Sequence, residues 1–189
     1  MRRNALTLLT LSALLLASES YASQNHPASN QSYESCGLIT GEYLTVLQLI
    51  SRGYTADSLK QSLPDISPEA QARVDDLARM ARNDGLVDSY STINSEYAGC
   101  AKKIFDARGL PPQGSREAYY HHCAGENKVG YEVAIAALIG ASKAEVIKQL
   151  EPQQKSGAQS IFMVLESKGR LGMFDSLATE LKRCLAAIP

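Results

Sequence analysis

The chain has 189 residues with 19 basic and 20 acidic side chains, a formal net charge of -1, four cysteines and no tryptophan. This balance does not favour nucleic acid as a partner, because phosphate binding needs clustered lysine and arginine. The chain has only three histidines, the side chains that titrate near neutral pH, so the composition does not favour an acid-sensing switch either.

The first part of the chain has the pattern of a secretory signal peptide. Two arginines precede an apolar run over residues 5–17, and small residues suited to cleavage follow. The run is shorter than the ~20 residues of a membrane-spanning helix. We therefore predict a signal peptide over residues 1–22 and a periplasmic or secreted protein. Residues 23–34 are rich in serine, asparagine and glutamine, and we predict a disordered arm there.

The remaining chain reads as helices throughout. Ile39, Tyr43, Val46, Leu47 and Ile50 recur at helical spacing, and a similar set ends at Ile139 in the second half. No stretch alternates with the period of a strand. The predicted class is all-α.

Glycine and serine mark where these helices should stop and start. Gly53 and Gly140 follow apolar helical stretches, at the position of a left-handed C-terminal cap. Ser142 and Glu145 have capping-box spacing, and Ser67 precedes a proline suited to a first helical turn.

The same order of helix start and stop signals occurs twice, once between each pair of cysteines. Positions 36 and 100 are 64 apart, and positions 123 and 184 are 61 apart. We predict two diverged four-helix repeats packed in tandem, over residues 35–106 and 119–189. Residues 107–118 contain two prolines and two glycines, and we interpret them as the linker.

Four cysteines allow three pairings, and the duplication favours the local one. Cys36 would bond to Cys100 and Cys123 to Cys184, which closes each repeat. An oxidising compartment makes disulfides the expected state. Each bridge would contribute about 4 kcal/mol by constraining the unfolded chain.

We expect no metal, no cofactor and no catalytic group. His121, His122, Cys123 and Glu126 lie close together in the sequence, but the cysteine has a predicted disulfide partner. Neighbouring residues on a helix also point about 100° apart and do not converge on one ion. No serine has the context of a hydrolase nucleophile, so we predict a protein that is not an enzyme.

One aromatic cluster is the candidate contact surface for a partner. Tyr119, Tyr120, His121 and His122 are consecutive at the start of the second half. Tyrosine combines contact area with a hydrogen-bonding tip, as recognition sites prefer. The alternative is that one of the two tyrosines packs between the halves.

Three functions fit this reading. The first is an exported module that binds an extracytoplasmic protein, such as an inhibitor or immunity protein that neutralises a secreted toxin or a cell-wall enzyme. The second is a carrier that holds a lipid or another small apolar ligand between its halves, with residues 133–141 as a candidate lining. The third is a structural envelope protein without a discrete site. We favour the first.

Overall fold

The computed structural model describes residues 31–63 and 65–187, and every regular element in those ranges is helical. The all-α prediction is confirmed. The predicted signal peptide lies outside the described residues. None of the described helices is both long and apolar enough to cross a membrane. The elements in chain order are α1 (Tyr33–Ser51), α2 (Ala56–Ser62), α3 (Pro68–Asn83), α4 (Leu86–Arg108), α5 (Arg116–Leu138), α6 (Lys143–Lys148), a 3-10 turn (Pro152–Gln154) and α7 (Lys155–Ala186).

Helix α1 begins inside the predicted arm of residues 23–34. Ser32 is its N-cap, and the side chains of Ser32 and Ser35 form a reciprocal capping box. Tyr33, in the first turn, is buried with 3 % of its surface exposed. Residues 23–30 lie outside the described part of the chain.

Most of the predicted helix boundaries are confirmed. Gly53 and Gly140 follow α1 and α5 with φ values of 94° and 82°, which is the left-handed region expected of a cap. Ser67 caps α3 by accepting a hydrogen bond from the Ala70 amide, with Pro68 in the first turn.

The capping box predicted for Ser142 is wrong. Its side chain makes no capping hydrogen bond to α6. The backbone shows the reason: ψ is 125° at Ser142 but 159° at Thr55, which starts the corresponding short helix α2 with a complete box. The side chain of Ser142 is therefore aimed differently.

Two side chains of the predicted apolar stripes are exposed instead of buried. Ile39 is 48 % exposed and Ile139, at the C-cap of α5, is 80 % exposed. The buried face of α1 runs through Cys36, Thr40 and Leu44. A threonine and a cysteine on this face shift it away from the line that hydrophobicity alone suggests.

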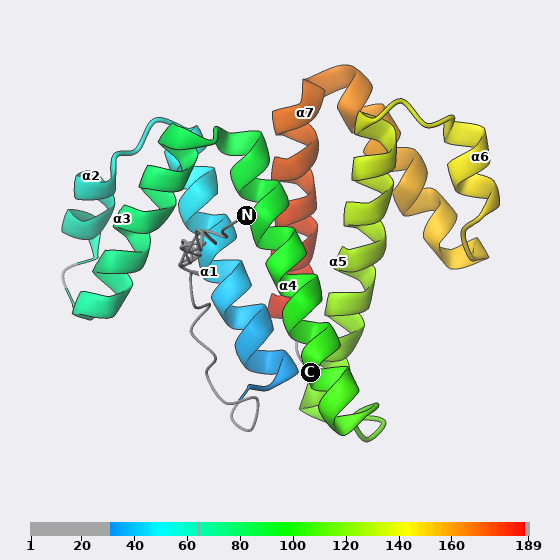
Figure 1. Cartoon of the computed structure of the whole chain (residues 1–189), viewed down its shortest axis with the longest axis horizontal. Helices are drawn as coiled ribbons and strands as arrows, with labels where there is room; N and C mark the ends of the chain where they lie inside the picture. Colours follow the sequence, from blue (N-terminus) through cyan, green and yellow to red (C-terminus); the bar gives the residue numbers. More distant parts are fainter. Residues whose placement is uncertain (1–30, 64, 188–189) are drawn as a thin grey trace, which may run out of the picture.

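The two halves of the chain share one main core. Helices α1 and α4 contact each other and also contact α5 and α7, so the four lie together at the centre of the molecule (Figure 1). Helices α2 and α3 flank this group on one side, and α6 with the first arm of α7 flanks it on the other. The largest fully buried side chains include Tyr90, Tyr97, Tyr120 and Phe174, which come from both halves.

Both halves contain a glycine before their last helix. Gly85 precedes α4 with φ 85°, and Gly169 interrupts α7 with φ 70° and ψ -173°. α7 is thereby divided into two arms, residues 155–168 and 170–186. The arrangement as two four-helix repeats in tandem stays a prediction. The connection between α4 and α5 covers residues 109–115, within the predicted linker 107–118.

Both disulfides have the predicted local pairing. Cys36 bonds to Cys100 with a Cα–Cα distance of 6.2 Å, and Cys123 bonds to Cys184 with 5.8 Å. The first joins the start of α1 to α4, and the second joins α5 to the end of α7. Each bridge therefore ties helices within one half of the chain.

Candidate functional site

The two tyrosines of the predicted contact cluster are structural. Tyr120 is completely buried, so it cannot contact a partner, and Arg116 lies over its ring at 5.6 Å. Tyr119 meets the Tyr120 ring edge-on at 6.2 Å, and its hydroxyl donates a hydrogen bond to the carbonyl oxygen of Cys184. Tyr120 belongs to the core that residues of both halves share, which agrees with the alternative that one of the two tyrosines packs between the halves.

The two histidines of the cluster face different surroundings. His121 is partly buried between two rings, with centroid distances of 4.8 Å to Tyr33 and 6.4 Å to Phe105. His122 is exposed. Consecutive residues on α5 point in different directions, so this run does not form a single binding surface.

The metal alternative finds no geometric support in the part of the chain that the structure describes. Cys123 is in a disulfide, and no three histidine, cysteine, aspartate or glutamate side chains there are grouped closely enough to hold an ion.

A groove with a volume of about 660 Å³ lies between α5 and the two arms of α7, and we call it the α5–α7 groove. The break at Gly169 lets the two arms diverge while α5 contacts both (Figure 1). Its volume lies in the usual range of ligand sites, roughly 300–1,000 Å³. We take it as the candidate functional site.

Buried apolar side chains form the floor of this groove. They come from α5 and from both arms of α7, so residues far apart in the sequence meet there. Such a surface favours contact with another apolar surface, because burial removes both from water. The floor consists of Val133, Ala158, Met173, Leu177 and Leu181, with Cys123 of the disulfide beside them.

Exposed polar side chains form the rim. Carboxylates, amides and hydroxyls on the rim supply hydrogen-bond acceptors and donors. Arg183 and Glu180 on the rim form an ion pair at 2.5 Å, so their opposite charges offset each other. The exposed polar members are Glu126, Gln153, Ser156, Ser160, Glu180 and Arg183.

A glycine on α5 helps to keep this groove open. Gly130 stands seven positions after Cys123 (130 - 123), and Tyr43 stands seven positions after Cys36 (43 - 36) in the first half. Tyr43 is partly buried and packs against the main core, whereas Gly130 lines the groove without a side chain. A Cβ at Gly130 would lie 3.0 Å from Cδ2 of Leu177, so a side chain there would press on the floor.

A buried amide pair holds one wall. The side-chain nitrogen of Asn127 donates to the side-chain oxygen of Asn94 at 2.9 Å, and the nitrogen of Asn94 donates to the Tyr90 carbonyl at 2.8 Å. Asn127 lines the groove on α5, and Asn94 belongs to α4. Two paired buried amides fix the rotation of α5 against α4, because unpaired amides there would be costly.

Sequence reasoning did not find this groove. Of the predicted alanine-rich lining over residues 133–141, Val133 contributes to it, whereas Ala134 and Ala137 are buried in helix packing. That packing matches the other role considered for small residues, which is close helix contact. The duplication itself offered a signal, since a comparison of the two halves sets Gly130 against Tyr43.

Comparisons with protein-family models, curated proteins and solved structures found no match to this chain.

Proposed function

We propose that this chain is an exported, non-enzymatic binding protein that holds a segment of an extracytoplasmic protein in the α5–α7 groove. The specific form we propose is a periplasmic inhibitor or immunity protein, which neutralises a secreted toxin or a cell-wall enzyme. The rest of the fold would then serve to present the groove.

The lining of the groove supports a polypeptide occupant. A bound segment offers apolar side chains together with backbone donors and acceptors at every residue. The floor matches the first with Val133, Leu177 and Leu181, and the rim matches the second with serines and amides. A hydrocarbon chain would contact the floor but would form no hydrogen bonds with the rim. This pairing of an apolar floor with a polar rim carries the proposal.

The disulfides support export and pre-organisation. Both are compatible with an oxidising compartment, as the arginines and apolar run of the predicted signal peptide require. The bond from Cys123 to Cys184 joins α5 to α7 directly at the groove. A rigid groove loses little conformational entropy when a partner binds.

The test is site-specific crosslinking in the native envelope. The full chain is exported with a photoreactive phenylalanine in place of Ser160 on the groove rim, or in place of Ser95 on the exposed side of α4 as control. We expect one protein to crosslink at 160 and not at 95. We also expect Ser156→Arg to abolish that crosslink. A crosslink of equal strength from both positions, or none from 160, would contradict the proposal.

A further inference from the structure

A second groove lies between the two halves of the chain. It runs along α1, is flanked by α2 and α3, and is closed on its other side by the end of α7. Its volume is about 430 Å³. Along α1 it extends from Leu38 to Leu49, which is about 16 Å at 1.5 Å per residue. We call it the α1–α3 groove.

The walls of this groove differ in kind from those of the α5–α7 groove. Leucine, valine, isoleucine and alanine dominate, and serine and amide side chains do not line it within the described residues. Leu38 and Leu63 stand at its edges and are 51 % and 49 % exposed. An occupant would remove both from water, which favours its binding. The apolar lining consists of Leu38, Val46, Leu49, Leu59, Leu63, Ile66, Ala70, Val74, Leu185 and Ala186.

Two charged side chains line the groove, and their situations differ. Glu42 forms an ion pair with Arg73 at 3.2 Å. Lys182 forms no ion pair with any carboxylate in the described part of the chain. Lys182 is therefore a positive charge in the groove without a direct ion-pair partner among the described residues, although the Asp175 carboxylate acts on it at longer range.

The Lys182 ammonium is held in place by a buried amide. It donates a hydrogen bond to the side-chain oxygen of Gln48, which is 3 % exposed. The nitrogen of Gln48 is held in turn by the Asp175 carbonyl and the Thr179 hydroxyl, both at 3.1 Å. An ammonium has three donors, so two remain for a ligand. Partial burial, and then the nearby Arg52, lower the pKa of Lys182, and the Asp175 carboxylate only partly opposes this shift.

We propose that the α1–α3 groove binds an anionic amphiphile with a single hydrocarbon chain, whose carboxylate pairs with Lys182 and whose chain lies along α1. Charge complementarity selects the headgroup, because an anion would give Lys182 the direct ion-pair partner that the described residues do not supply. Apart from the two charged side chains, the described lining holds one hydroxyl, that of Thr45, which already donates to the Gly41 carbonyl at 2.8 Å. Such walls suit a hydrocarbon, which has no hydrogen bonds to satisfy.

The test compares palmitate with hexadecanol, a neutral molecule with a chain of the same length. Binding to the purified full chain is followed by calorimetry and by the carboxyl carbon signal of labelled palmitate. We expect palmitate to bind in a one-to-one ratio and hexadecanol to bind at least about tenfold more weakly. Equal affinity for the two, or no binding of palmitate by the folded protein, would overturn the proposal.

Variants locate the site. Lys182→Gln should weaken palmitate about tenfold and leave hexadecanol unchanged, whereas Lys182→Arg should retain palmitate. Thr45→Phe, which fills the groove from α1, should weaken both ligands. The matched control is Lys128→Gln on the exposed side of α5, where Lys128 pairs with Glu132. Undiminished palmitate affinity in a folded Lys182→Gln variant would refute the assignment.

This inference does not depend on the protein partner. Ser156 belongs to the α5–α7 groove and Lys182 to the α1–α3 groove. Ser156→Arg should abolish the crosslink and keep palmitate binding. Lys182→Gln should keep the crosslink and weaken palmitate binding. Failure of one proposal therefore leaves the other measurable.

Discussion

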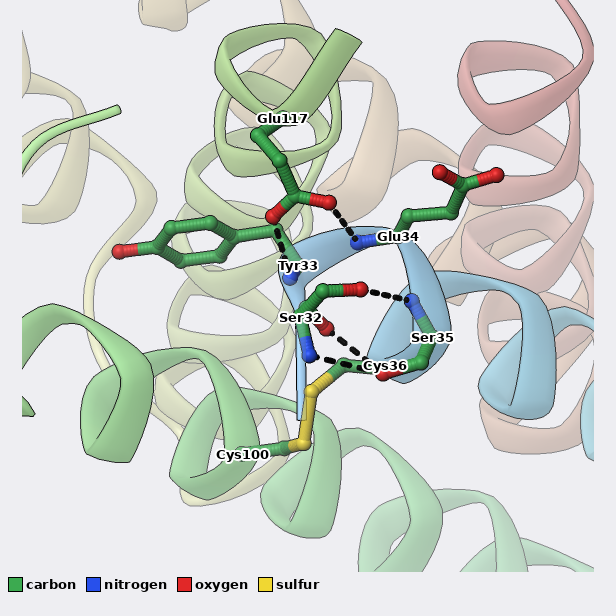
Figure 2. Close-up of a disulfide and its surroundings, with 7 residues drawn as sticks. All are labelled: Ser32, Tyr33, Glu34, Ser35, Cys36, Cys100 and Glu117. Atoms are coloured by element: carbon green, nitrogen blue, oxygen red, sulfur yellow. Dashed lines mark hydrogen bonds between the residues drawn. A yellow bond between two sulfur atoms is a disulfide. The ribbon is translucent and has the colours of Figure 1, made fainter. Parts of the chain in front are cut away.

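Glu117 caps a helix to which it does not belong, and its removal gives a sharp test of the fold. It lies in the first turn of α5, yet its carboxylate accepts hydrogen bonds from the α1 amides of Tyr33 at 2.8 Å and Glu34 at 3.3 Å (Figure 2). The capping box of Ser32 and Ser35 uses the amides on either side of these two. The amides of the N-cap and of the first three helical residues of α1 are thus all paired.

These contacts set the expected loss of stability when Glu117 is replaced by alanine. Loss of a helix cap costs about 0.5–2 kcal/mol, and hydrogen bonds to a charged acceptor contribute about 1.5–3 kcal/mol. Glu117 is partly exposed, so water replaces some of what is lost. We expect Glu117→Ala to lower the free energy of unfolding by about 1–2 kcal/mol. At about 2–4 °C per kcal/mol, the melting temperature should fall by roughly 2–8 °C.

The assay is urea unfolding with the disulfides intact, together with amide hydrogen exchange. The amides of Tyr33 and Glu34 should exchange faster in Glu117→Ala, because they lose their acceptor. Glu117→Gln keeps one acceptor oxygen and should fall between wild type and alanine. The matched control is Glu132→Ala, which removes an exposed pair with Lys128 and should cost less than about 0.5 kcal/mol. Equal losses for positions 117 and 132 would refute the capping argument.

Three further predictions follow. The hydrogen bond from Arg116 lowers the pKa of the Glu34 carboxyl, so this pair contributes stability above the ordinary glutamate pKa and loses it as the pH falls through the lowered value. In Arg116→Gln, a carboxyl NMR titration should show an upward shift of the Glu34 midpoint. An unchanged midpoint would contradict the pairing. A Cβ at Gly37 would lie 2.8 Å from Leu185 Cδ2, but a Cβ at Gly99 would meet nothing within 4 Å. In urea unfolding, Gly37→Ala should therefore destabilise the protein by about 1–3 kcal/mol and Gly99→Ala should stabilise it by about 0.5–1 kcal/mol. A stability change of the same sign for both variants would contradict the packing. Replacing both cysteines of the second-half disulfide by serine should cost up to about 4 kcal/mol, and peptide mapping without reductant should find no peptide that links cysteines of different halves.

The candidate sites were less predictable than the helices. The aromatic run from Tyr119 to His122 looked like a contact surface because its residues are neighbours in the chain. On a helix, however, neighbours diverge, and Tyr120 enters the core while His122 faces solvent. The α5–α7 groove depends instead on residues 123–133 meeting residues 153–187, which no local pattern indicates.

What the sequence determined by itself was local chemistry and its spacing. Helical periodicity, Ser67 before a proline, and glycines at 53 and 140 each act within a few residues, so the class and most boundaries could be predicted. The cysteine spacing recurs in both halves of the chain, and this repetition predicted both disulfides.

Only the tertiary structure decided which faces meet. Gly130 lines a groove because the two arms of α7, which meet at Gly169, both approach α5 there. Among the described residues Lys182 forms a hydrogen bond with Gln48, 134 positions earlier, and no ion pair within 4 Å. Such features depend on the relative placement of distant helices, and the pattern within each helix does not encode that placement by itself.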